Sequence, residues 1–412
     1  MIEWSEQQKL ARGEIRKFIE AEIVPLNEQL EYGDLPPYDI IRKLYRTFGI
    51  DEISRARFEK SIAKEEALAN GESLAPASET AEDDKDLSID TLLSLELCRH
   101  AAGIVTAMGV TQLAAGAIMS KGSIEQKKRW GLDLLTAEKV GSWAITEPGS
   151  GSDAFGGMTS TAQLTSEGNY VLNGSKTFIT NGPYADTIVF ICKLLEEGVD
   201  PRQRKIMTFI LDKGMPGLEQ SGRLRKMGLH SSPTGQLFLD GVVAGPERLL
   251  GGQSKGTKGG AKRSDPKATF AAERAGVVSM SLGVVERCLE LCVEYAKERV
   301  QWEKPIGEYQ LVQLKLADME VARLNIQNML FNYIERKNKG VAMSFAEASA
   351  MKLYSTKAAV EVASEAIQIF GGNGYMAEYK VEQLYRDARV MRIYGGTDEM
   401  QVRAIARDLL SR

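Results

Sequence analysis

The hydrophobic positions in the first third of the chain recur at helical spacing. Apolar residues between positions 15 and 24 fall on one side of a helix, and a Pro-Pro pair at 36–37 interrupts the pattern before a second helix, expected over 38–48. From 54 to 90 the composition shifts to Glu, Ala, Ser, Asp and Lys, which predicts a loop or an exposed helix. Helical spacing returns over 89–137. The pattern predicts an N-terminal helical region.

The middle of the chain changes to the period of β-strands. Residues 170–180 read as a strand, an Asn-Gly turn and a second strand, and β-branched or aromatic runs follow at 187–194, 206–211 and 236–243. No helical segment separates these runs, so a parallel nucleotide-binding sheet is disfavoured. An antiparallel β-barrel or sandwich is expected.

Helical spacing is strong again from residue 268 to the end. Comparable patterns occupy 311–336, 344–370 and 381–389, and a final helix is expected from Asp398. The predicted fold class is α+β, with an N-terminal helical domain (1–140, in which 54–90 is an atypical, insertion-like segment), a middle antiparallel β-barrel or sandwich domain (141–252) and a C-terminal four-helix-bundle domain (253–412).

Composition favours small-molecule chemistry. The 412 residues carry a net charge of −4 and no basic tail, which argues against nucleic acid or an anionic membrane surface as the main partner. The four cysteines form no CxxC pair and the chain has two histidines, so no metal site is expected. The thiols are expected to be reduced and buried. The polar N-terminus is unlike a targeting peptide, and no apolar run approaches membrane-spanning length. We expect a cytoplasmic protein.

One stretch, WAITEPGSGSD at 143–153, breaks an apolar run with glycines, small hydroxyl residues and one acid. Gly149 and Gly151 have no Cβ, so the backbone there can approach a flat or phosphate-bearing ligand closely. An ordinary turn between two strands has the same composition. The stretch is therefore a candidate cofactor loop whose surroundings must decide.

Five segments of the chain have the form of sequence motifs. They are, in chain order, ITEPGSGSD (145–153), LNGSKTFITN (172–181), KERVQW (297–302), QIFGGNGY (368–375, continuing to YRDAR at 385–389) and IYGGT (393–397). These segments resemble motifs of the acyl-CoA dehydrogenases, flavoproteins that desaturate acyl-CoA thioesters. Together they span nearly the whole chain. The resemblance implies the same α–β–α order, an FAD cofactor, an acyl-CoA substrate and a homotetramer, or a homodimer, that passes electrons to an electron-transferring flavoprotein.

The resemblance also implies which residues hold the cofactor. One wall of the flavin site would be formed by Trp143, Ile145, Thr146, Gly151, Ser152, Phe178 and Thr180. The diphosphate and adenine end would be contacted from neighbouring subunits by Arg299, Gln301 and Trp302 and by Gln368, Gly371 and Gly372, and Thr397 and Glu399 would add contacts near the flavin. Position 178 departs from the Trp often found there: Phe keeps a flat apolar wall but lacks the indole donor.

Desaturation needs a carboxylate that takes the α-proton of the thioester while a hydride leaves the β-carbon for flavin N5. Many family members place this Glu at the position of Gly395, which cannot abstract a proton. A subset that includes the isovaleryl-CoA and long-chain enzymes places it at the start of the first bundle helix, before an Arg, and FAAERAG at 270–276 matches this with Glu273-Arg274. Glu273 is the expected base, and Glu399 is the alternative. Ser152, Arg274 and Gly395 are expected to contact the substrate. The alternative roles of Arg274 are to orient the Glu273 carboxylate or, as the preferred interpretation, to hold a nearby helix end.

Other interpretations stay open from the sequence. A relative on this fold could pass electrons to oxygen as an acyl-CoA oxidase or a flavin monooxygenase, and Gly395 also allows a non-catalytic partner subunit. The base position occurs in enzymes for branched and for long acyl chains, so acyl length is not determined. The Lys/Arg-rich segment 255–267 is expected to contact the CoA 3′-phosphate or the nucleotide.

Overall fold

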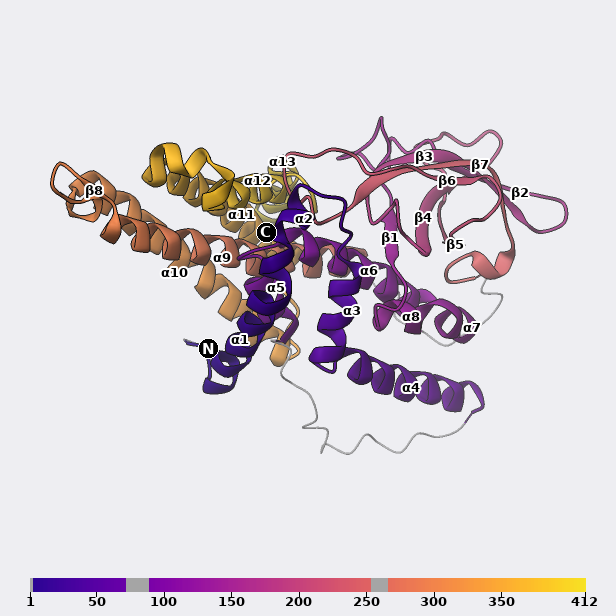
Figure 1. Cartoon of the computed structure of the whole chain (residues 1–412). Coiled ribbons are helices and arrows are strands. Elements are labelled where there is room, and N and C mark those ends of the chain that lie inside the picture. The colour runs from indigo at the N-terminus through magenta and orange to yellow at the C-terminus, as the bar shows by residue number, and fades with distance from the viewer. Residues whose placement is uncertain (1–2, 72–88, 253–265) are drawn as a thin grey trace.

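The structure, a computed structural model, describes residues 3–71, 89–252 and 266–412 (Figure 1). It confirms the predicted α+β class: helices come first, a β-sheet follows and long helices close the chain. Most of the Lys/Arg-rich segment 255–267 lies outside the described residues, as does the acidic part of 54–90.

The N-terminal helices begin with a well-defined cap. The Ser5 hydroxyl accepts a hydrogen bond from Gln8 N, and the Gln8 side chain accepts one from Ser5 N, so two otherwise unpaired backbone donors are satisfied. The elements are α1 (Glu6–Phe18), η1 (Ile19–Ile23), η2 (Val24–Leu26), α2 (Asn27–Glu31), α3 (Tyr38–Thr47), α4 (Ile50–Ala69), α5 (Ile89–Leu97), α6 (Ala102–Lys121), α7 (Ile124–Gln126), η3 (Lys127–Gly131) and α8 (Leu132–Leu135). Within α4 only Phe58 and Ile62 are buried, so the described start of segment 54–90 is an exposed helix, one of the two predicted forms.

Helix α6 corrects one expectation from the sequence. Its 20 residues and mean hydropathy of 1.5 are sufficient for a membrane span by length and composition. However, 56% of its apolar window is buried inside the protein, and Ala114 packs against Gly141 at the start of the sheet. This is the environment of a core helix, so the span is weak evidence for a membrane.

The β region is one mixed sheet without a closed barrel in the described residues. Its strands are β1 (Gly141–Ala144), β2 (Thr161–Leu164), β3 (Tyr170–Thr180), β4 (Thr187–Leu194), β5 (Ile206–Asp212), β6 (Leu218–Gln220) and β7 (Thr234–Ala244), followed by η4 (Pro246–Arg248). The order is β1-β4-β2-β3-β7-β6, and β5 pairs with β4. The expectation of a purely antiparallel region was wrong, because β1 and β2 both run parallel to β4.

The predicted hairpin at Asn173-Gly174 was also wrong, since β3 continues through it as one strand. Gly174 has a φ of +144°, and the register with β7 shifts there. A Cβ on Gly174 would lie 2.2 Å from the Ser160 hydroxyl, so glycine serves a close approach inside the sheet. The dipeptide marks a bulge, not a turn.

The C-terminal helices and the N-terminal helices share one hydrophobic core. The later elements are α9 (Pro266–Glu298), β8 (Val300–Gln301), β9 (Lys304–Pro305), η5 (Ile306–Glu308), α10 (Gln310–Asn338), α11 (Phe345–Phe370), η6 (Gly371–Tyr375), η7 (Ala377–Tyr379), α12 (Val381–Met391) and α13 (Asp398–Leu410). Buried side chains of α1, α3, α5, α9, α10 and α11 form a single cluster, whereas the sheet encloses a separate core. Figure 1 shows the helices and the sheet side by side.

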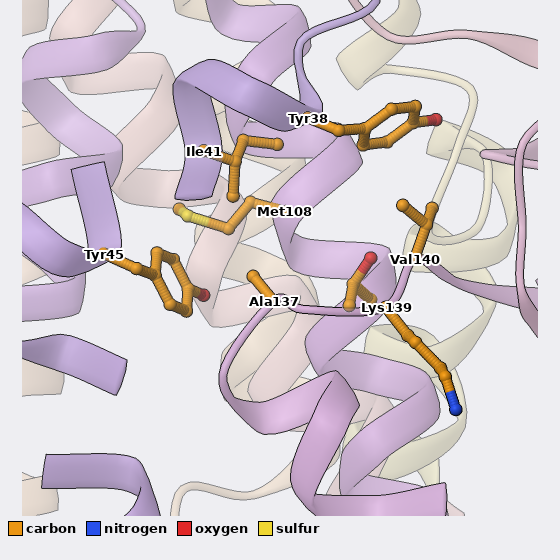
Figure 2. A pocket seen from close by; sticks show the side chains of 8 residues that line it. Tyr38, Ile41, Tyr45, Met108, Ala137, Lys139 and Val140 are labelled. Atoms are coloured by element: carbon orange, nitrogen blue, oxygen red, sulfur yellow. The ribbon is translucent and has the colours of Figure 1, made fainter. Parts of the chain in front are cut away.

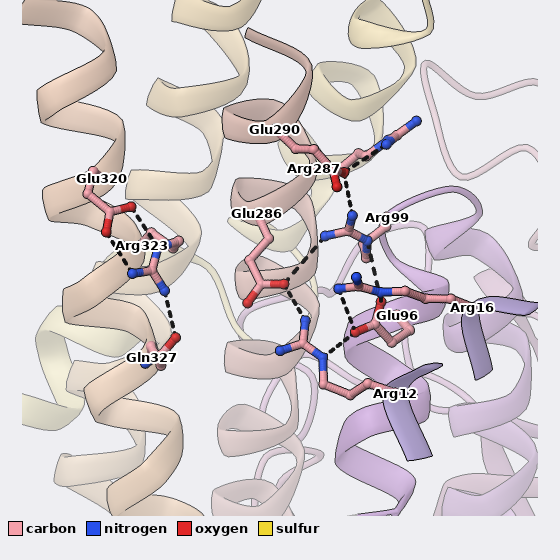
Figure 3. Close-up of polar contacts among 10 residues, drawn as sticks. All are labelled: Arg12, Arg16, Glu96, Arg99, Glu286, Arg287, Glu290, Glu320, Arg323 and Gln327. Carbon is pink, nitrogen blue, oxygen red and sulfur yellow. Dashed lines mark hydrogen bonds and ion pairs between the residues drawn. The ribbon is translucent and has the colours of Figure 1, made fainter. Parts of the chain in front are cut away.

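A buried ion-pair network joins the two helical regions (Figure 3). Glu96 of α5 is 0% exposed, and its carboxylate pairs with Arg12 and Arg16 of α1. Arg12 also pairs with Glu286 of α9, and Arg99 pairs with Glu290. These contacts fix α1 and α5 on the middle of α9.

Candidate active site

The candidate cofactor loop follows β1 and is bonded to β3. Thr146 O accepts a hydrogen bond from Thr177 N at 2.9 Å, so the loop and the strand form one surface. Trp143, Ile145 and Thr146 are partly buried along it, while Gly151 and Ser152 are exposed. No protein atom lies within 4 Å of the Cβ positions of Gly149 or Gly151, so the glycines face open space.

The sequence did not single out Glu147 and Lys176, whose buried side chains connect the loop to β3 beneath this surface. Their ion pair measures 2.9 Å and the two side chains are 2% and 0% exposed. The Glu147 carboxylate also accepts hydrogen bonds from Thr159 N, Thr159 Oγ1 and Ser160 N at 2.6–2.9 Å, and Lys176 also donates to Ile145 O at 3.2 Å. Burial raises the pKa of Glu147, but these donors outweigh it and lower the pKa to about 2.

We expect Glu147→Ala to destabilise the protein by about 3–5 kcal/mol, because it leaves the Lys176 ammonium buried and unpaired. The pKa of Glu147 is lower in the folded state, so its stabilisation is present at neutral pH and is lost as the pH falls toward 2. The melting temperature of the parent should therefore fall as the pH approaches 2, and the variant should lack this part of the pH dependence. An unchanged melting temperature at neutral pH would contradict this.

Phe178 projects from the same surface in a strained conformation. Its φ is +57°, its side chain is 70% exposed, and it lies at a register shift between β3 and β7. A left-handed aromatic residue costs free energy and keeps an apolar ring in solvent, which is a pattern found at ligand sites. Thr180, two residues later, is partly buried. The surface offers an apolar wall suited to a flat ligand.

The structure brings Glu273 and Gly395 together. A Cβ on Gly395 would lie 3.5 Å from Glu273 Oε1 and 3.8 Å from its carboxyl carbon. Gly395 has a φ of +59° and Gly396 a φ of +92°, so the turn between α12 and α13 favours glycine. Burial raises the pKa of Glu273, and the cations Arg274 and Lys352 oppose this shift. This carboxyl is partly buried and poised to take up a proton.

Arg274 contacts helix α11. Its Nη1 donates to Ser349 Oγ at 2.6 Å, and its guanidinium lies 4.0 Å from the centre of the Phe345 ring. Its Nη2 lies 3.2 Å from the Cβ position of Gly396. Arg274 therefore fixes the start of α9 against α11 beside the glycine turn.

Thr397 and Glu399 follow the glycine turn at the start of α13. Thr397 is the N-cap residue and is partly buried, whereas Glu399 is exposed. The pKa of Glu399 is lowered by its own backbone N–H and by the Thr397 hydroxyl. An exposed carboxylate with a lowered pKa is a weaker base than the buried Glu273.

The remaining predicted cofactor residues lie on the tip of the bundle. Arg299, Gln301 and Trp302 are exposed on or beside the β8–β9 hairpin, where Trp302 is 84% exposed with a φ of +47°. Figure 1 shows this hairpin at the opposite end of the molecule from the sheet. Within one chain these residues do not meet the wall that carries Phe178.

Gln368, Gly371 and Gly372, at the end of α11 and the start of η6, are also exposed. Tyr295, one turn before Arg299, stacks on Phe370 with ring centres 4.1 Å apart. Its hydroxyl accepts a hydrogen bond from Asn373 Nδ2 at 2.9 Å. The structure thus groups the two sets that the sequence assigned to the diphosphate and adenine end.

A small apolar cavity lies elsewhere, between α3, α6 and residues 137–140 (Figure 2). Tyr38, Tyr45 and Met108 line it, and its volume is about 10 Å³. That space holds at most one water molecule, so it is too small for an acyl chain.

Disulfides and metal-binding clusters are both missing from the described residues. All four cysteines are buried and unpaired by disulfides, as expected. In residues 3–71, 89–252 and 266–412, no group of three or more His, Cys, Asp or Glu is arranged to hold a metal ion.

Comparison with known families gives two domain matches. Residues 142–242 match the middle domain of acyl-CoA dehydrogenases, and residues 264–410 match their C-terminal domain. An acyl-CoA dehydrogenase of Bacillus subtilis is 33% identical over 98% of both chains. The CarC subunit of the caffeyl-CoA reductase-Etf complex of Acetobacterium woodii is 32% identical over 99% of this chain and 100% of its own.

Solved structures agree with these matches. Butyryl-CoA dehydrogenase from Megasphaera elsdenii superposes with a TM-score of 0.83 at 30% identity over the whole of both chains. An acyl-CoA dehydrogenase from Bacillus anthracis complexed with FAD gives a TM-score of 0.77 at 26% identity, covering 99% of this chain and 68% of that one.

Proposed function

The chain belongs to the acyl-CoA dehydrogenase family, and from this premise we propose that it desaturates an acyl-CoA thioester between Cα and Cβ with Glu273 as the base. The observation that carries the proposal is the 3.5 Å distance between Glu273 Oε1 and the position that a Cβ at residue 395 would occupy. The carboxylate from α9 reaches the space that a side chain at position 395 would occupy. In this proposal helix α9 supplies the base in place of the turn between α12 and α13, and the catalytic position is retained.

The cofactor is FAD, and the described residues fit it. The exposed Phe178 ring, the open positions over Gly149 and Gly151, and the hydroxyls of Thr146 and Ser152 would hold the flavin. When bound, FAD supplies the acceptor for the hydride that leaves Cβ. Phe178 packs as an apolar wall and offers no hydrogen-bond donor there.

Glu273 acts on the substrate as follows. Its carboxylate removes a proton from Cα, which is acidic because it adjoins the thioester carbonyl. Burial keeps the pKa of Glu273 above its usual value, which makes the ionised form a stronger base. The rate should therefore rise with pH as this carboxyl ionises. Arg274 holds the start of the helix that presents it.

A second copy of the chain completes the cofactor site in this proposal. Arg299, Gln301 and Trp302 are exposed on or beside the β8–β9 hairpin, far from the sheet, so they can reach a diphosphate bound to a neighbouring chain. A guanidinium is suited to a bidentate grip on a diphosphate. We take the assembly to be a homotetramer or a homodimer, placed in the cytoplasm.

The electron acceptor proposed is an electron-transferring flavoprotein, in line with the Etf-associated relative of Acetobacterium woodii. We expect anaerobic bleaching of the flavin by butyryl-CoA and rapid reoxidation by such a flavoprotein, with slow reoxidation by air. The measurement is absorbance of the flavin after mixing with each acceptor, with a panel of longer and branched acyl-CoA esters run alongside.

Three other results would each select a different function. Fast reoxidation by air with peroxide formation would indicate an acyl-CoA oxidase. Oxygen insertion into an added substrate would indicate a flavin monooxygenase. A protein that neither holds FAD nor bleaches with any ester would indicate a non-catalytic partner subunit.

A further inference from the structure

A buried lysine holds the glycine turn beside Glu273. Lys352 lies in the first third of α11 with 0% exposure, and its Nζ donates to Gly396 O at 2.7 Å. Gln401 of α13 donates to the same carbonyl at 2.6 Å and to Gly395 O at 3.2 Å. Donors from two helices therefore fix both carbonyl groups of the turn that faces the Glu273 carboxylate.

The charges that face Lys352 come from three places. Glu273 and Arg274 face it from α9, Asp398 from the start of α13, and Arg392 from the end of α12. Arg392 forms an ion pair with Asp398 Oδ2 at 2.7 Å, so this carboxylate already has a cationic partner. Glu273, by contrast, forms no hydrogen bond or ion pair within the described part of the chain. Its counter-charge therefore comes from two nearby cations without a direct ion pair, Arg274 first and Lys352 second.

Burying an ammonium is costly, and a Met side chain would fill similar space without that cost. Burial lowers the pKa of Lys352 to about 8, against the pull of Asp398, so the cation persists at neutral pH. A lysine here is explained if its charge is needed when Glu273 is ionised.

We propose that Lys352 is a positioning residue for the desaturation, which fixes the Gly395–Gly396 turn against Glu273 and keeps a cation beside its carboxylate. The inference rests on the proposed role of Glu273. Lys352 does not touch the substrate in this proposal and acts only through the turn and the carboxylate.

The test is the pH profile of anaerobic flavin bleaching by butyryl-CoA in Lys352→Met, Lys352→Arg and the parent holoenzyme. Loss of the cation raises the pKa of Glu273 further, so the acid limb of the rate should move up by about one pH unit in Lys352→Met. At pH values on the acid side of the limb, the rate of Lys352→Met should be about tenfold below that of the parent, while KM changes little. Lys352→Arg keeps the charge and should keep the limb in place.

Lys193→Met is the matched control, because Lys193 is 2% exposed and donates to Gly156 O at 2.8 Å, far along the sheet. It should lower the melting temperature and leave the acid limb unchanged. An unshifted limb in Lys352→Met would overturn the proposal, since a purely structural lysine lowers stability without moving it.

A further variant tests the proposal if Lys352→Met does not fold. Lys352→Gln keeps a donor for Gly396 O without the charge, so it should still shift the limb, and an unshifted limb there would equally overturn the proposal. Glu273→Gln separates the two ideas: if that variant bleaches at the parent rate, the proposed function fails. If it is inactive while the Lys352 variants keep the parent limb, only the role of Lys352 fails.

Discussion

Glu273→Gln is expected to slow the bleaching of the flavin by acyl-CoA about 10²–10⁴-fold, the range that a general base contributes. Gln has the shape of Glu but cannot accept the α-proton. Since no hydrogen bond of Glu273 is lost, FAD content and melting temperature should match the parent. The measurement is anaerobic stopped-flow absorbance of the oxidised flavin with saturating butyryl-CoA.

Glu294→Gln is the matched control, because Glu294 lies exposed on the same helix. It should bleach at the parent rate. Glu399→Gln tests the alternative base that the sequence left open. Loss of activity in Glu399→Gln with full activity in Glu273→Gln would transfer the catalytic role to the start of α13.

Adding Gly395→Glu to the Glu273→Gln protein should restore part of the bleaching. The Cβ position of Gly395 is 3.5 Å from Glu273 Oε1, so a carboxylate built there reaches the same space. The recovery should be incomplete, because a φ of +59° strains any residue other than glycine. A double variant that stays as slow as Glu273→Gln alone would argue that the two positions do not serve the same atom of the substrate.

The sequence predicted the fold class and most element boundaries because both helical regions bury one face at a regular period. Helix α3 begins at Tyr38 and α13 at Asp398, as expected. The sheet was harder to predict. Residues 161–164 carry no strong strand signal. In the sheet, β1 and β2 both pair with β4 in parallel, at different points along it. Pairing between distant strands leaves no local pattern to read.

Glu147 and Lys176 show what local reading misses at the site. Each stands within a motif that the sequence analysis quoted, but a charge in a polar loop and a charge in a strand both suggest solvent. Only the fold shows that they meet at 2.9 Å in the interior. A lysine in the alternating pattern of a buried strand was the available signal, because such a residue is almost never buried without a partner.

Arg299→Ala is expected to lose most of its bound FAD, and mixing it with Glu273→Gln should restore activity that neither variant has alone. In the proposed assembly, the flavin lies on the wall of one chain and its diphosphate is held by Arg299 of another. In a mixed oligomer, some sites combine Glu273 of the Arg299→Ala chain with Arg299 of the Glu273→Gln chain. Those sites are complete.

The experiment is co-expression of the two variants with different tags and purification through both, followed by FAD content and anaerobic bleaching. Lys297→Ala, an exposed cation two residues before Arg299, replaces Arg299→Ala in the control and should keep its FAD. Complementation has half of the sites as its ceiling, because the other half carry Gln at position 273. If the doubly tagged oligomer stays inactive, each chain builds its site alone, and the β8–β9 hairpin and the sheet, which lie apart in Figure 1, must then come together within one chain.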